Sequence, residues 1–297
     1  MFDDVSAQSM LNLRDENEIL SSLVDDSVAV SVIVPAYNQL DYIHDTVQGI
    51  LAQKTNFYFE IILHDDASKD GTQEIILMYT KHYPNIIIPV LREVNVYQKG
   101  ISPIAECLKL ARGKYVAICE GDDFWTSPDK LQAQYDFMEK NKKYTFMCHN
   151  AKVHYIDTNV SCLFNKNLKA GPYSTVDLIF RKWFIPTASL FFRKNIIAGT
   201  IPDWYGSVRS QDLALEIMLS LQGDFWYQDE VMSVYRKNAI GSLSSRNEKP
   251  WNYLKLRIFL FKKLSDLFPM QLKPLAWLDI ILSMIKIVYA KVLSLRN

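Results

Sequence analysis

The chain has 297 residues, of which 49% are hydrophobic and 22% are charged, and it carries 33 basic and 33 acidic side chains. These values are typical of a globular protein and exclude an intrinsically disordered chain. The formal net charge is zero and no folded segment carries a basic stripe, which argues against a nucleic-acid-binding protein. The length fits one α/β domain with appendages.

Residues 1–27 predict an acidic amphipathic arm or docking helix, with apolar positions at Leu11, Leu13, Ile19, Leu20 and Leu23. The first residues, MFDDVSAQSM, lack a basic segment followed by an apolar one, so we expect no secretory signal. The cysteines lack the spacing of zinc ligands or of a disulfide framework; they are Cys107, Cys119, Cys148 and Cys162. We therefore expect a cytoplasmic protein.

Residues 28–141 alternate short β-branched runs with segments of helical spacing. The runs VAVSVIVPAY, FEIILHDD, NIIIPVL and KYVAICEGDD predict strands, and DYIHDTVQGILAQ, GTQEIILMYTKHY and SPIAECLKLARG predict the helices between them. This alternation predicts an α/β fold with a mainly parallel sheet flanked by helices. Because ligands of such sheets bind beyond the carboxyl ends of the strands, the polar strand ends at 35–38, 64–68 and 120–125 form the candidate site.

The end of the second predicted strand reads HDDASKDGT, residues 64–72. Asp65 and Asp66 can cap the helix that follows, and Gly71 permits a tight turn. Taken alone, this motif favours that structural interpretation over a binding site.

The end of the fourth predicted strand reads CEGDDFWTSPDKLQ. Adjacent carboxylates at Asp122 and Asp123 repel each other unless a cation lies between them. Carboxylate oxygens suit hard cations such as Mg²⁺ or Mn²⁺, which bridge phosphate oxygens. Ser127 and Pro128 are predicted as the N-cap and first residue of the next helix.

In the second half, SQDLALEIMLSLQG predicts a helix that begins near Ser210. Asp212 in its first turn can simply favour the helix dipole. His149 and His154 in CHNAKVHY have no acid at matching spacing, so we expect core or acceptor-loop residues and not metal ligands.

Taken together, SVIVPAYN, HDDASKDGT and GKYVAICEGDDFW resemble the nucleotide-binding half of family-two glycosyltransferases over about residues 28–141. SQDLALEIMLSLQGDFWYQDEVMSVYR, residues 210–236, resembles a later part of the same family. The resemblance implies the GT-A fold, a Rossmann-like nucleotide-diphospho-sugar transferase fold with a mixed, mainly parallel sheet. Residues 28–250 would form the catalytic domain, with a nucleotide-sugar-binding half at 28–141 and an acceptor-binding half at 142–250.

The resemblance also implies an activity and roles for single residues. A sugar would move with inversion from a nucleotide-diphosphate donor, by analogy UDP, to a glycan or polyprenyl-linked acceptor in surface polysaccharide synthesis. By the resemblance, Pro35, Ala36, Tyr37 and Asn38 would line the nucleoside pocket, and Asp66 would accept a hydrogen bond from the ring N–H of the base. Asp122 would lie near the ribose, and Asp123 would bind a Mn²⁺ or Mg²⁺ ion. Asp212 would act as the catalytic base.

Donor-phosphate contacts are expected from Lys99 with the Gly100 backbone, and from Arg236 with Lys237 in a flap at 235–242. Trp183 and Trp204 are expected either to stack on a sugar ring or to be buried. The sequence departs from the family at Glu120, where many relatives have Asp, and lacks the Arg-Asn pair common after the third strand.

Two other functions compete with this interpretation. A nucleotidyltransferase should have a Gly-rich triphosphate loop after the first strand, where this chain has PAYNQLDY. A catalytically degenerate homologue that scaffolds a polysaccharide-synthesis complex is left open by Glu120 and the missing Arg-Asn pair.

Residues 251–297 predict a basic, amphipathic, helical extension. Its bases are Lys255, Arg257, Lys262, Lys263, Lys273, Lys286, Lys291 and Arg296, and its acids are Asp266 and Asp279. With its aromatic residues, this composition favours peripheral attachment to the anionic inner face of the cell membrane. The alternatives are a membrane-spanning helix, which Asp279, Lys286 and Lys291 make costly, and a helical pair packed on the catalytic domain.

Overall fold

The protein is described by a computed structural model that covers residues 14–21, 27–181, 183–197, 199–240, 242 and 250–294. Leu11, Leu13 and Leu23 of the predicted arm and Gly241 of the predicted flap lie outside the described residues.

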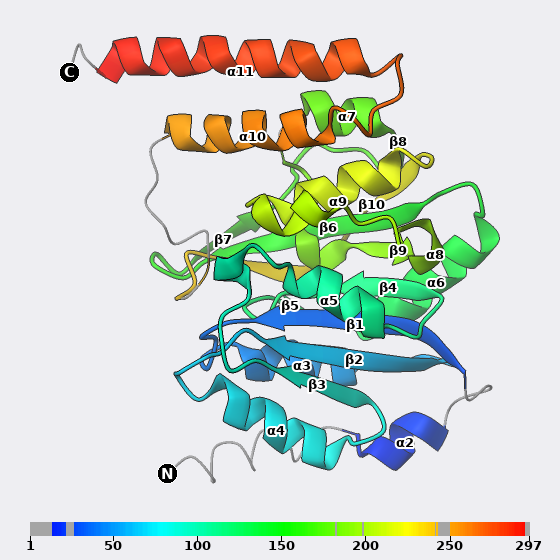
Figure 1. Ribbon diagram of the computed structural model, residues 1–297. Helices are drawn as coiled ribbons and strands as arrows, with labels where there is room; N and C mark the ends of the chain where they lie inside the picture. The colour runs from blue at the N-terminus through cyan, green and yellow to red at the C-terminus, as the bar shows by residue number, and fades with distance from the viewer. Residues whose placement is uncertain are drawn as a thin grey trace.

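The helices and strands follow one another through the whole chain (Figure 1). Up to residue 141 they are α2 (Glu16–Ser21), β1 (Val28–Ala36), α3 (Ile43–Leu51), β2 (Tyr58–Asp65), α4 (Thr72–His82), β3 (Ile87–Leu91), η1 (Tyr97–Lys99), α5 (Pro103–Leu110), β4 (Tyr115–Ile118), β5 (Phe124–Trp125) and α6 (Lys130–Lys140). Beyond it they are β6 (Phe146–Tyr155), β7 (Val160–Leu163), β8 (Gly171–Tyr173), α7 (Thr175–Phe180), η2 (Thr187–Ser189), β9 (Phe191–Arg193), α8 (Lys194–Ile197), η3 (Asp203–Ser207), α9 (Gln211–Ser220), β10 (Phe225–Lys237), α10 (Pro250–Leu264) and α11 (Lys273–Ser294).

A single mixed sheet joins both halves of the catalytic region, with the strand order β3-β2-β1-β4-β9-β6-β10-β5. The strands from β3 to β4 pair in parallel, as the alternation of strands and helices predicts. β9 pairs antiparallel with both β4 and β6, and β10 pairs parallel with β6. The sheet therefore continues from the strands of residues 28–141 into the second half of the chain without a break.

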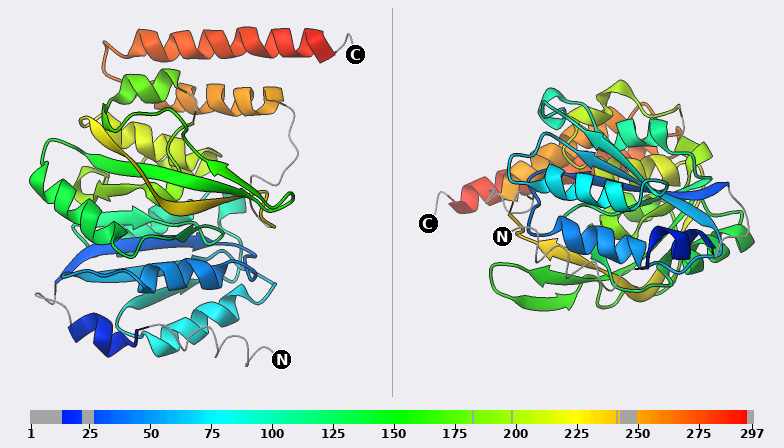
Figure 2. Two further views of the ribbon diagram at one scale, coloured as in Figure 1. Left: turned by 180° about the vertical axis from the view of Figure 1, so that it is seen from behind. Right: turned by 90° about the horizontal axis from the view of Figure 1, so that it is seen from below.

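Both faces of the sheet are covered by helices, as Figures 1 and 2 show. Successive strand side chains point to opposite faces, and in β1 Ile33 belongs to one buried cluster while Val32 and Val34 belong to the other. The first cluster includes residues of α5, α7 and α9, and the second includes residues of α3, α4 and α6. Burial on both faces explains why β1 and β2 are nearly continuous apolar runs.

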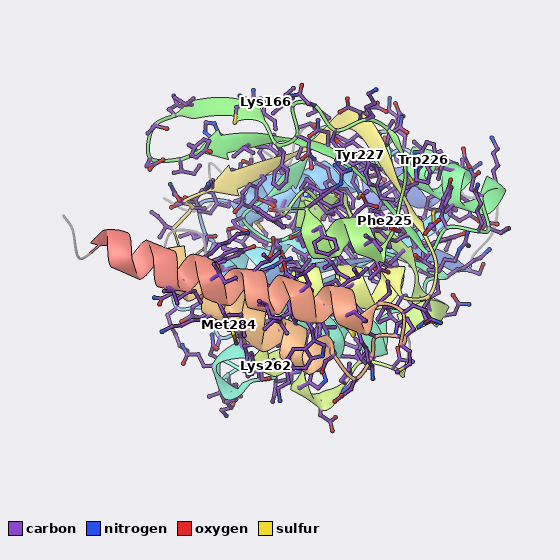
Figure 3. The ribbon with its side chains drawn as sticks, turned by 90° about the horizontal axis from the view of Figure 1, so that it is seen from above. Lys166, Phe225, Trp226, Tyr227, Lys262 and Met284 are labelled. Atoms are coloured by element: carbon purple, nitrogen blue, oxygen red, sulfur yellow. The ribbon has the colours of Figure 1, made fainter. Side chains whose placement is uncertain are left out.

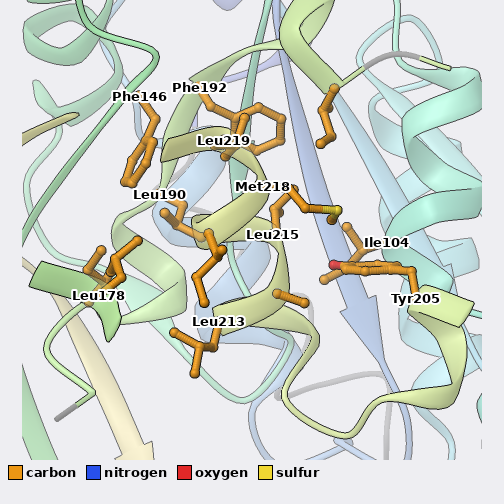
Figure 4. Close-up of a cluster of buried hydrophobic side chains, with 14 of the residues drawn as sticks. Ile104, Phe146, Leu178, Leu190, Phe192, Tyr205, Leu213, Leu215, Met218 and Leu219 are labelled. Carbon is orange, nitrogen blue, oxygen red and sulfur yellow. The ribbon is translucent and has the colours of Figure 1, made fainter. Parts of the chain in front are cut away.

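Helix α9 is embedded in the first cluster, as Figure 4 shows. Its side chains Leu213, Leu215, Met218 and Leu219 lie among Phe146, Leu178, Leu190 and Phe192. All residues of α9 except Asp212 are buried. Burial of the helix on nearly all sides fixes its N-terminus, and with it the position of Asp212.

The start of α6 differs from the prediction. The helix begins at Lys130 with Asp129 as its N-cap, two residues later than expected. Ser127 and Pro128 are instead tied to the end of α3, because the Ser127 carbonyl accepts from Gln53 Nε2 at 2.8 Å and the Pro128 carbonyl accepts from the Lys54 backbone at 2.8 Å. These tertiary hydrogen bonds hold the segment in an extended turn.

The described part of the N-terminal arm docks on the catalytic region. Ile19 of α2 is buried in the second cluster, and Glu16 accepts hydrogen bonds from the backbone of Asn85 and Ile86 at 2.7 and 3.1 Å. At the other end of the chain, α10 and α11 pack against each other and α11 contacts α7. Among the residues that the structure describes, no helix is long and apolar enough to cross a membrane.

The fold prediction is confirmed: a mixed, mainly parallel sheet is flanked by helices and followed by C-terminal helices. His149 and His154 lie on β6. His149 is fully buried with Nδ1 2.7 Å from the Asn150 carbonyl oxygen, and His154 Nδ1 lies 3.0 Å from Ser161 Oγ.

Candidate functional site

A cavity of about 540 Å³ opens at the carboxyl ends of β1, β2 and β4. Its lining combines the strand ends with the N-terminus of α9; the residues are Pro35, Ala36, Tyr37, Gln39, Asp66, Asn95, Tyr97, Gln98, Pro103, Ile104, Glu120, Asp122, Trp183, Thr187, Arg209, Ser210, Gln211, Asp212, Tyr235 and Ser242. The structure therefore gathers six predicted site residues, Pro35, Ala36, Tyr37, Asp66, Asp122 and Asp212, around one space. Asn38, Lys99, Asp123 and Arg236 are not on this lining.

The loop after β1 is held by Asn38, which has a left-handed backbone with φ of 53°. Its side-chain oxygen accepts from the Lys69 backbone at 2.9 Å, and its own backbone N–H donates to Ser68 Oγ at 2.8 Å. Asn is among the few residues other than Gly that adopt this conformation at low cost. Asn38 thus joins the loops after β1 and β2, while Pro35, Ala36 and Tyr37 form the cavity wall.

The two adjacent acids after β2 have different surroundings. Asp65 accepts three hydrogen bonds from its loop and the start of α4: from the Ser68 backbone at 2.9 Å, from the Ser68 hydroxyl and from Gln73 Nε2 at 2.6 Å. Asp66 faces the cavity and accepts from the backbone N–H groups of Val96 and Tyr97 at 2.6 and 3.0 Å. Asp66 therefore fixes the segment between β3 and α5, including η1, at the cavity edge.

Only part of that segment reaches the cavity. Tyr97 and Gln98 line it, whereas Lys99 is exposed and lies off the lining. The sequence NVYQKG predicted that this segment lies near the donor, but it did not distinguish the side chains that line the cavity from those that point away.

The acid loop, residues 120–123, places three carboxyl groups in two environments. Glu120 and Asp122 line the cavity. Asp123 is fully buried behind them, with Oδ1 accepting from the Arg236 backbone at 2.9 Å and Oδ2 without a hydrogen-bond partner. The Thr46 hydroxyl lies 2.9 and 2.6 Å from the carbonyl oxygens of Gly121 and Asp123, which anchors the loop on α3.

Gly121 in this loop is closely packed. A Cβ at Gly121 would collide with the side chain of Gln39 and would lie 3.0 Å from the Ala36 Cβ. A side chain at this position would displace Gln39 and crowd Ala36, so glycine allows the loop to lie close against the end of β1.

The three carboxyl groups of the acid loop have raised pKa values. Burial, and then the neighbouring Asp122 and Asp212, raise the pKa of Glu120 to about 8. Burial also raises the pKa of Asp122, and the pKa of Asp123 is raised by burial and then by Asp122 and Glu120. A cation near these groups would stabilise their ionised forms.

Arg236 supports the acid loop. Its guanidinium forms an ion pair with Asp45, donates to the Asp122 carbonyl oxygen at 3.1 Å and lies 4.3 Å from the ring centre of Phe124. The Arg236 side chain is 9% exposed. Since its donors already serve these groups, the predicted contact between Arg236 and the donor phosphates gains no support from this geometry. The basic side chain on the described lining is Arg209.

Asp212 lies in the first turn of α9 and faces the acid loop across the cavity. Burial raises its pKa, while hydrogen bonds from the Leu213 and Asp212 backbones and from the Trp183 side chain act in the opposite direction. Ser102, at the N-terminus of α5, donates to Gln211 Oε1 at 2.6 Å and so links the two halves beside the acid. A carboxylate with a raised pKa, open to a cavity, is suited to proton transfer.

Aromatic side chains form the wall next to Asp212. Trp183 and Tyr235 line the cavity with ring centres 5.4 Å apart, and Phe164 packs on Trp183 at 4.8 Å. Trp183 is 38% exposed, whereas Trp204 is partly buried and packs against the first cluster. Of the two predicted sugar-stacking residues, only Trp183 is available to a ligand in the cavity.

Among the described residues, no group of three His, Cys, Asp or Glu side chains forms a ready-made metal cage. The pair Glu120 and Asp122 nevertheless fits Mg²⁺ or Mn²⁺, because these sites commonly use one or two carboxylates and take further ligands from substrate phosphates and water. The partnerless oxygen of Asp123 adjoins this pair in the same loop.

Comparison with known proteins now identifies the family. The family model described as "Glycosyl transferase family 2" matches residues 31–196, more than half of the chain. The chain belongs to glycosyl transferase family 2. The matched region contains β1 from Ser31 onward, Asp66 and the acid loop, and it ends before Asp212.

Two relatives illustrate the range of similarity. The uncharacterized protein Rv1520 of Mycobacterium tuberculosis is 34% identical over 224 residues, which cover 71% of this chain and 60% of Rv1520. WfaP of Escherichia coli, a "UDP-Glc:alpha-D-GlcNAc-diphosphoundecaprenol beta-1,3-glucosyltransferase", is 40% identical over 114 residues, which cover 38% of this chain and 42% of WfaP. The chain thus spans less than two thirds of the length of these relatives.

Solved structures show the same fold at low sequence identity. Staphylococcus aureus TarS 1-349 in complex with UDP-GlcNAc has a TM-score of 0.61 at 16% identity, covering 89% of this chain and 81% of TarS 1-349. The mannosyltransferase PcManGT from Pyrobaculum calidifontis, in complex with GDP-Man and Mn²⁺, has a TM-score of 0.58 at 13% identity, covering 99% of this chain and 81% of its own.

Proposed function

We propose that this glycosyltransferase transfers a sugar from a UDP-sugar to a hydroxyl of a glycan or polyprenyl-linked acceptor in surface polysaccharide synthesis. The observation that carries the proposal is the cavity, in which the strand ends of the nucleotide-binding half face Asp212. The printed activity of WfaP, with a UDP-sugar donor and a diphosphoundecaprenol-linked acceptor, supports this substrate class.

The nucleoside would lie between the loop of Pro35, Ala36 and Tyr37 and the carboxylate of Asp66. Each Asp66 oxygen already accepts one backbone N–H. A carboxylate oxygen has a second acceptor site, so Asp66 can still accept the ring N–H of a uracil base. Asn38 would act through the loop that it holds, and Asp122 lies where the ribose and diphosphate would follow.

Glu120 and Asp122 would hold a Mn²⁺ or Mg²⁺ ion. When bound, the ion would offset the charge that develops on the departing nucleotide diphosphate. The family resemblance implies that Asp123 binds the ion, and this remains a prediction, because Asp123 Oδ2 has no hydrogen-bond partner and lies in the same loop. The cavity lining favours Asp122 as the ligand, with Asp123 maintaining the loop against β10.

Asp212 would act as the base of a single displacement with inversion. Its carboxylate would take the proton of the acceptor hydroxyl as that oxygen bonds to the anomeric carbon of the donor. The bond from the anomeric carbon to the diphosphate oxygen would break, and its electron pair would leave with the nucleotide diphosphate. Trp183 beside Asp212 would present an apolar ring face to the acceptor.

Lys99 and Arg236 remain predicted phosphate contacts, although both side chains lie off the cavity lining. Arg209 and Gln98 occupy the lining and are alternative candidates. A shift of η1 on donor binding would be needed to bring Lys99 to the phosphates.

Incubating the protein with Mn²⁺ and a panel of UDP- and GDP-sugars, with and without lipid-linked acceptors, tests the proposal by mass spectrometry of the products. We expect a UDP-sugar to be consumed and its sugar to appear on an acceptor. Binding of a nucleotide sugar without turnover of any donor would favour the scaffold alternative. Release of pyrophosphate from a nucleoside triphosphate would instead indicate a nucleotidyltransferase.

A polyprenyl-linked acceptor stays in the bilayer, so we also propose that the enzyme works in the cytoplasm at the inner membrane face. The basic composition of residues 251–297 supports this placement.

A further inference from the structure

The outer side of α11 is an exposed apolar surface. Among the side chains of α11 that the structure describes, seven large apolar ones are between 39% and 63% exposed: Trp277, Leu278, Ile281, Leu282, Met284, Ile285 and Val288. Their spacing repeats every three to four residues, which places them on one side of the helix. These residues define the α11 outer face. An apolar surface of this extent on a monomer commonly marks an interaction site.

The opposite side of α11 already has its packing partners within the chain. Ala276, Ile280 and Ser283 are buried against α10 and the first cluster, and Asp279 forms an ion pair with Arg257 at 2.9 Å. Figure 3, viewed from above, shows α11 in front of the rest of the molecule, with Met284 on it. No described segment of this chain covers the outer face.

The charges at the two edges of this face are positive, and the exposed acid of the helical pair, Asp266, lies in the segment between α10 and α11. By helical spacing, Lys273 and Lys286 lie at opposite edges of the apolar side of α11. Lys255 and Lys262 are exposed on the neighbouring helix α10. The acid on the described part of α11 is Asp279, which Arg257 neutralises on the buried side.

This charge pattern distinguishes between possible occupants. Two copies of the chain packed through their outer faces would bring lysines of the same sign together without an acid on that face to pair with them. An apolar strip flanked by lysines instead matches a bilayer interface, where apolar side chains enter the acyl boundary and lysines meet anionic headgroups. Trp277 is of the residue type enriched at that depth.

We propose that the α11 outer face binds an anionic phospholipid bilayer, with α11 lying in the plane of the interface. The inference deepens the proposed function, on whose membrane placement it rests, but it uses no residue of the cavity. Helix α10 then acts as the spacer between the bilayer and the catalytic region. In Figure 1, α11 lies at the end of the molecule opposite α4.

Flotation of the full chain with vesicles tests the proposal. The vesicles contain either phosphatidylcholine alone or phosphatidylcholine with about 30% phosphatidylglycerol, which gives a strong negative surface potential. The face variant is Ile285→Glu with Val288→Glu. The matched control is Leu77→Glu with Val94→Glu, which changes two side chains of similar exposure, 51% and 55%, far from α11.

We expect the wild-type chain and the control to float with the anionic vesicles, and the face variant to lose at least about tenfold in partition coefficient. Replacing Lys273 and Lys286 by Gln should weaken binding by roughly fivefold per lysine at low salt, and less at high salt. Turnover of soluble donor and acceptor should be the same in wild type and face variant, which separates this proposal from the proposed activity.

Three results would overturn the proposal: no flotation of the wild-type chain, flotation unchanged in the face variant, or a wild-type dimer in solution that the face variant converts to monomer while neither binds vesicles. The last result would assign the face to a second copy of the chain. Flotation of a chain that turns over no nucleotide sugar would support the membrane surface and reject the proposed activity.

Discussion

At the scale of single residues, neighbouring acids in the chain have different tasks. Asp65 holds its own loop and Asp66 faces the cavity. In the acid loop, Asp122 faces the cavity and Asp123 faces the backbone of β10. A loop turns successive side chains to different sides, so two adjacent acids at a strand end seldom share one function.

The acid loop gives the first prediction. Asp122→Asn removes a cavity-facing charge, so turnover should fall by at least about 10²-fold and more Mn²⁺ should be needed for half-maximal activity. Asp123→Asn preserves the oxygen that accepts from the Arg236 backbone and should retain more activity than Asp122→Asn. Titration of activity with Mn²⁺ measures both effects. The reverse order of the two variants would return the ion to Asp123.

Trp183 gives a second prediction. Its hydrogen bond lowers the pKa of Asp212 against the effect of burial. In Trp183→Phe that pKa should rise, and because the base acts when deprotonated, the acid limb of kcat/KM should move to higher pH. Trp204 lies off the cavity lining, so Trp204→Phe is the control and should leave the acid limb of the kcat/KM profile at the wild-type pH. Identical profiles for wild type and Trp183→Phe would show that Trp183 does not act on the base.

Sequence reasoning identified the residue types at the site better than their orientations. The motifs predicted which strand ends carry polar residues, and Pro35, Asp66, Asp122 and Asp212 do line one cavity. They did not predict that Arg236 pairs with Asp45, because these residues are far apart in the chain and meet only through the pairing of β10 in the sheet. Roles for Tyr97 and Gln211 were also missed, because their positions depend on tertiary hydrogen bonds from the Tyr97 backbone to Asp66 and from Ser102 to Gln211.

At the scale of elements, α6 carries an ammonium group into the core. Lys130 is fully buried, donates to Gln134 Oε1 at 2.7 Å and lies 3.8 Å from the ring centre of Trp125. Burial lowers its pKa from 10.5 to about 7. The first turn of α6 therefore holds a group that changes charge near neutral pH.

Stability should depend on pH through this lysine. Between about pH 7 and 10.5 the unfolded chain binds the proton of Lys130 and the folded chain does not, so the free energy of unfolding should rise with pH in this window. The slope attributable to Lys130 is at most about 1.4 kcal/mol per pH unit. Denaturant unfolding of Lys130→Met should lack this rise relative to wild type.

Lys140→Met, at the exposed end of the same helix, is the matched control and should keep the wild-type slope. A parallel pH dependence in wild type and Lys130→Met would mean that Lys130 stays protonated in the folded protein.

The elements of residues 28–141 were predictable because each strand and helix has its own period and end signals. The second half was not predictable to the same degree. β9 has only three residues, and its antiparallel pairing with β4 and β6 depends on the tertiary fold. The predicted start of α6 was wrong because hydrogen bonds from Gln53 and Lys54, in the segment that follows α3, outweighed the capping preference of Ser127.

At the scale of the whole molecule, one sheet joins residues 28–141 to the second half of the chain, and the cavity lies where the two parts meet. The Ser102–Gln211 hydrogen bond and the backbone bond from Arg236 to Asp123 connect the two halves at the cavity itself. The helical pair α10 and α11 lies at one end, which predicts a fixed orientation of the enzyme if α11 binds a bilayer. Composition predicted the basic extension, but only the packing shows which side of α11 is free.

The central claim is that Asp212 serves as the base of sugar transfer. The most direct measurement compares wild type and Asp212→Asn for transfer rate, donor affinity by calorimetry and melting temperature. A base need not touch the donor, so transfer should fall by roughly 10²- to 10⁴-fold while the donor dissociation constant stays within a few-fold. Near-wild-type transfer with a lowered melting temperature would show that Asp212 only stabilises the start of α9, and would contradict the account.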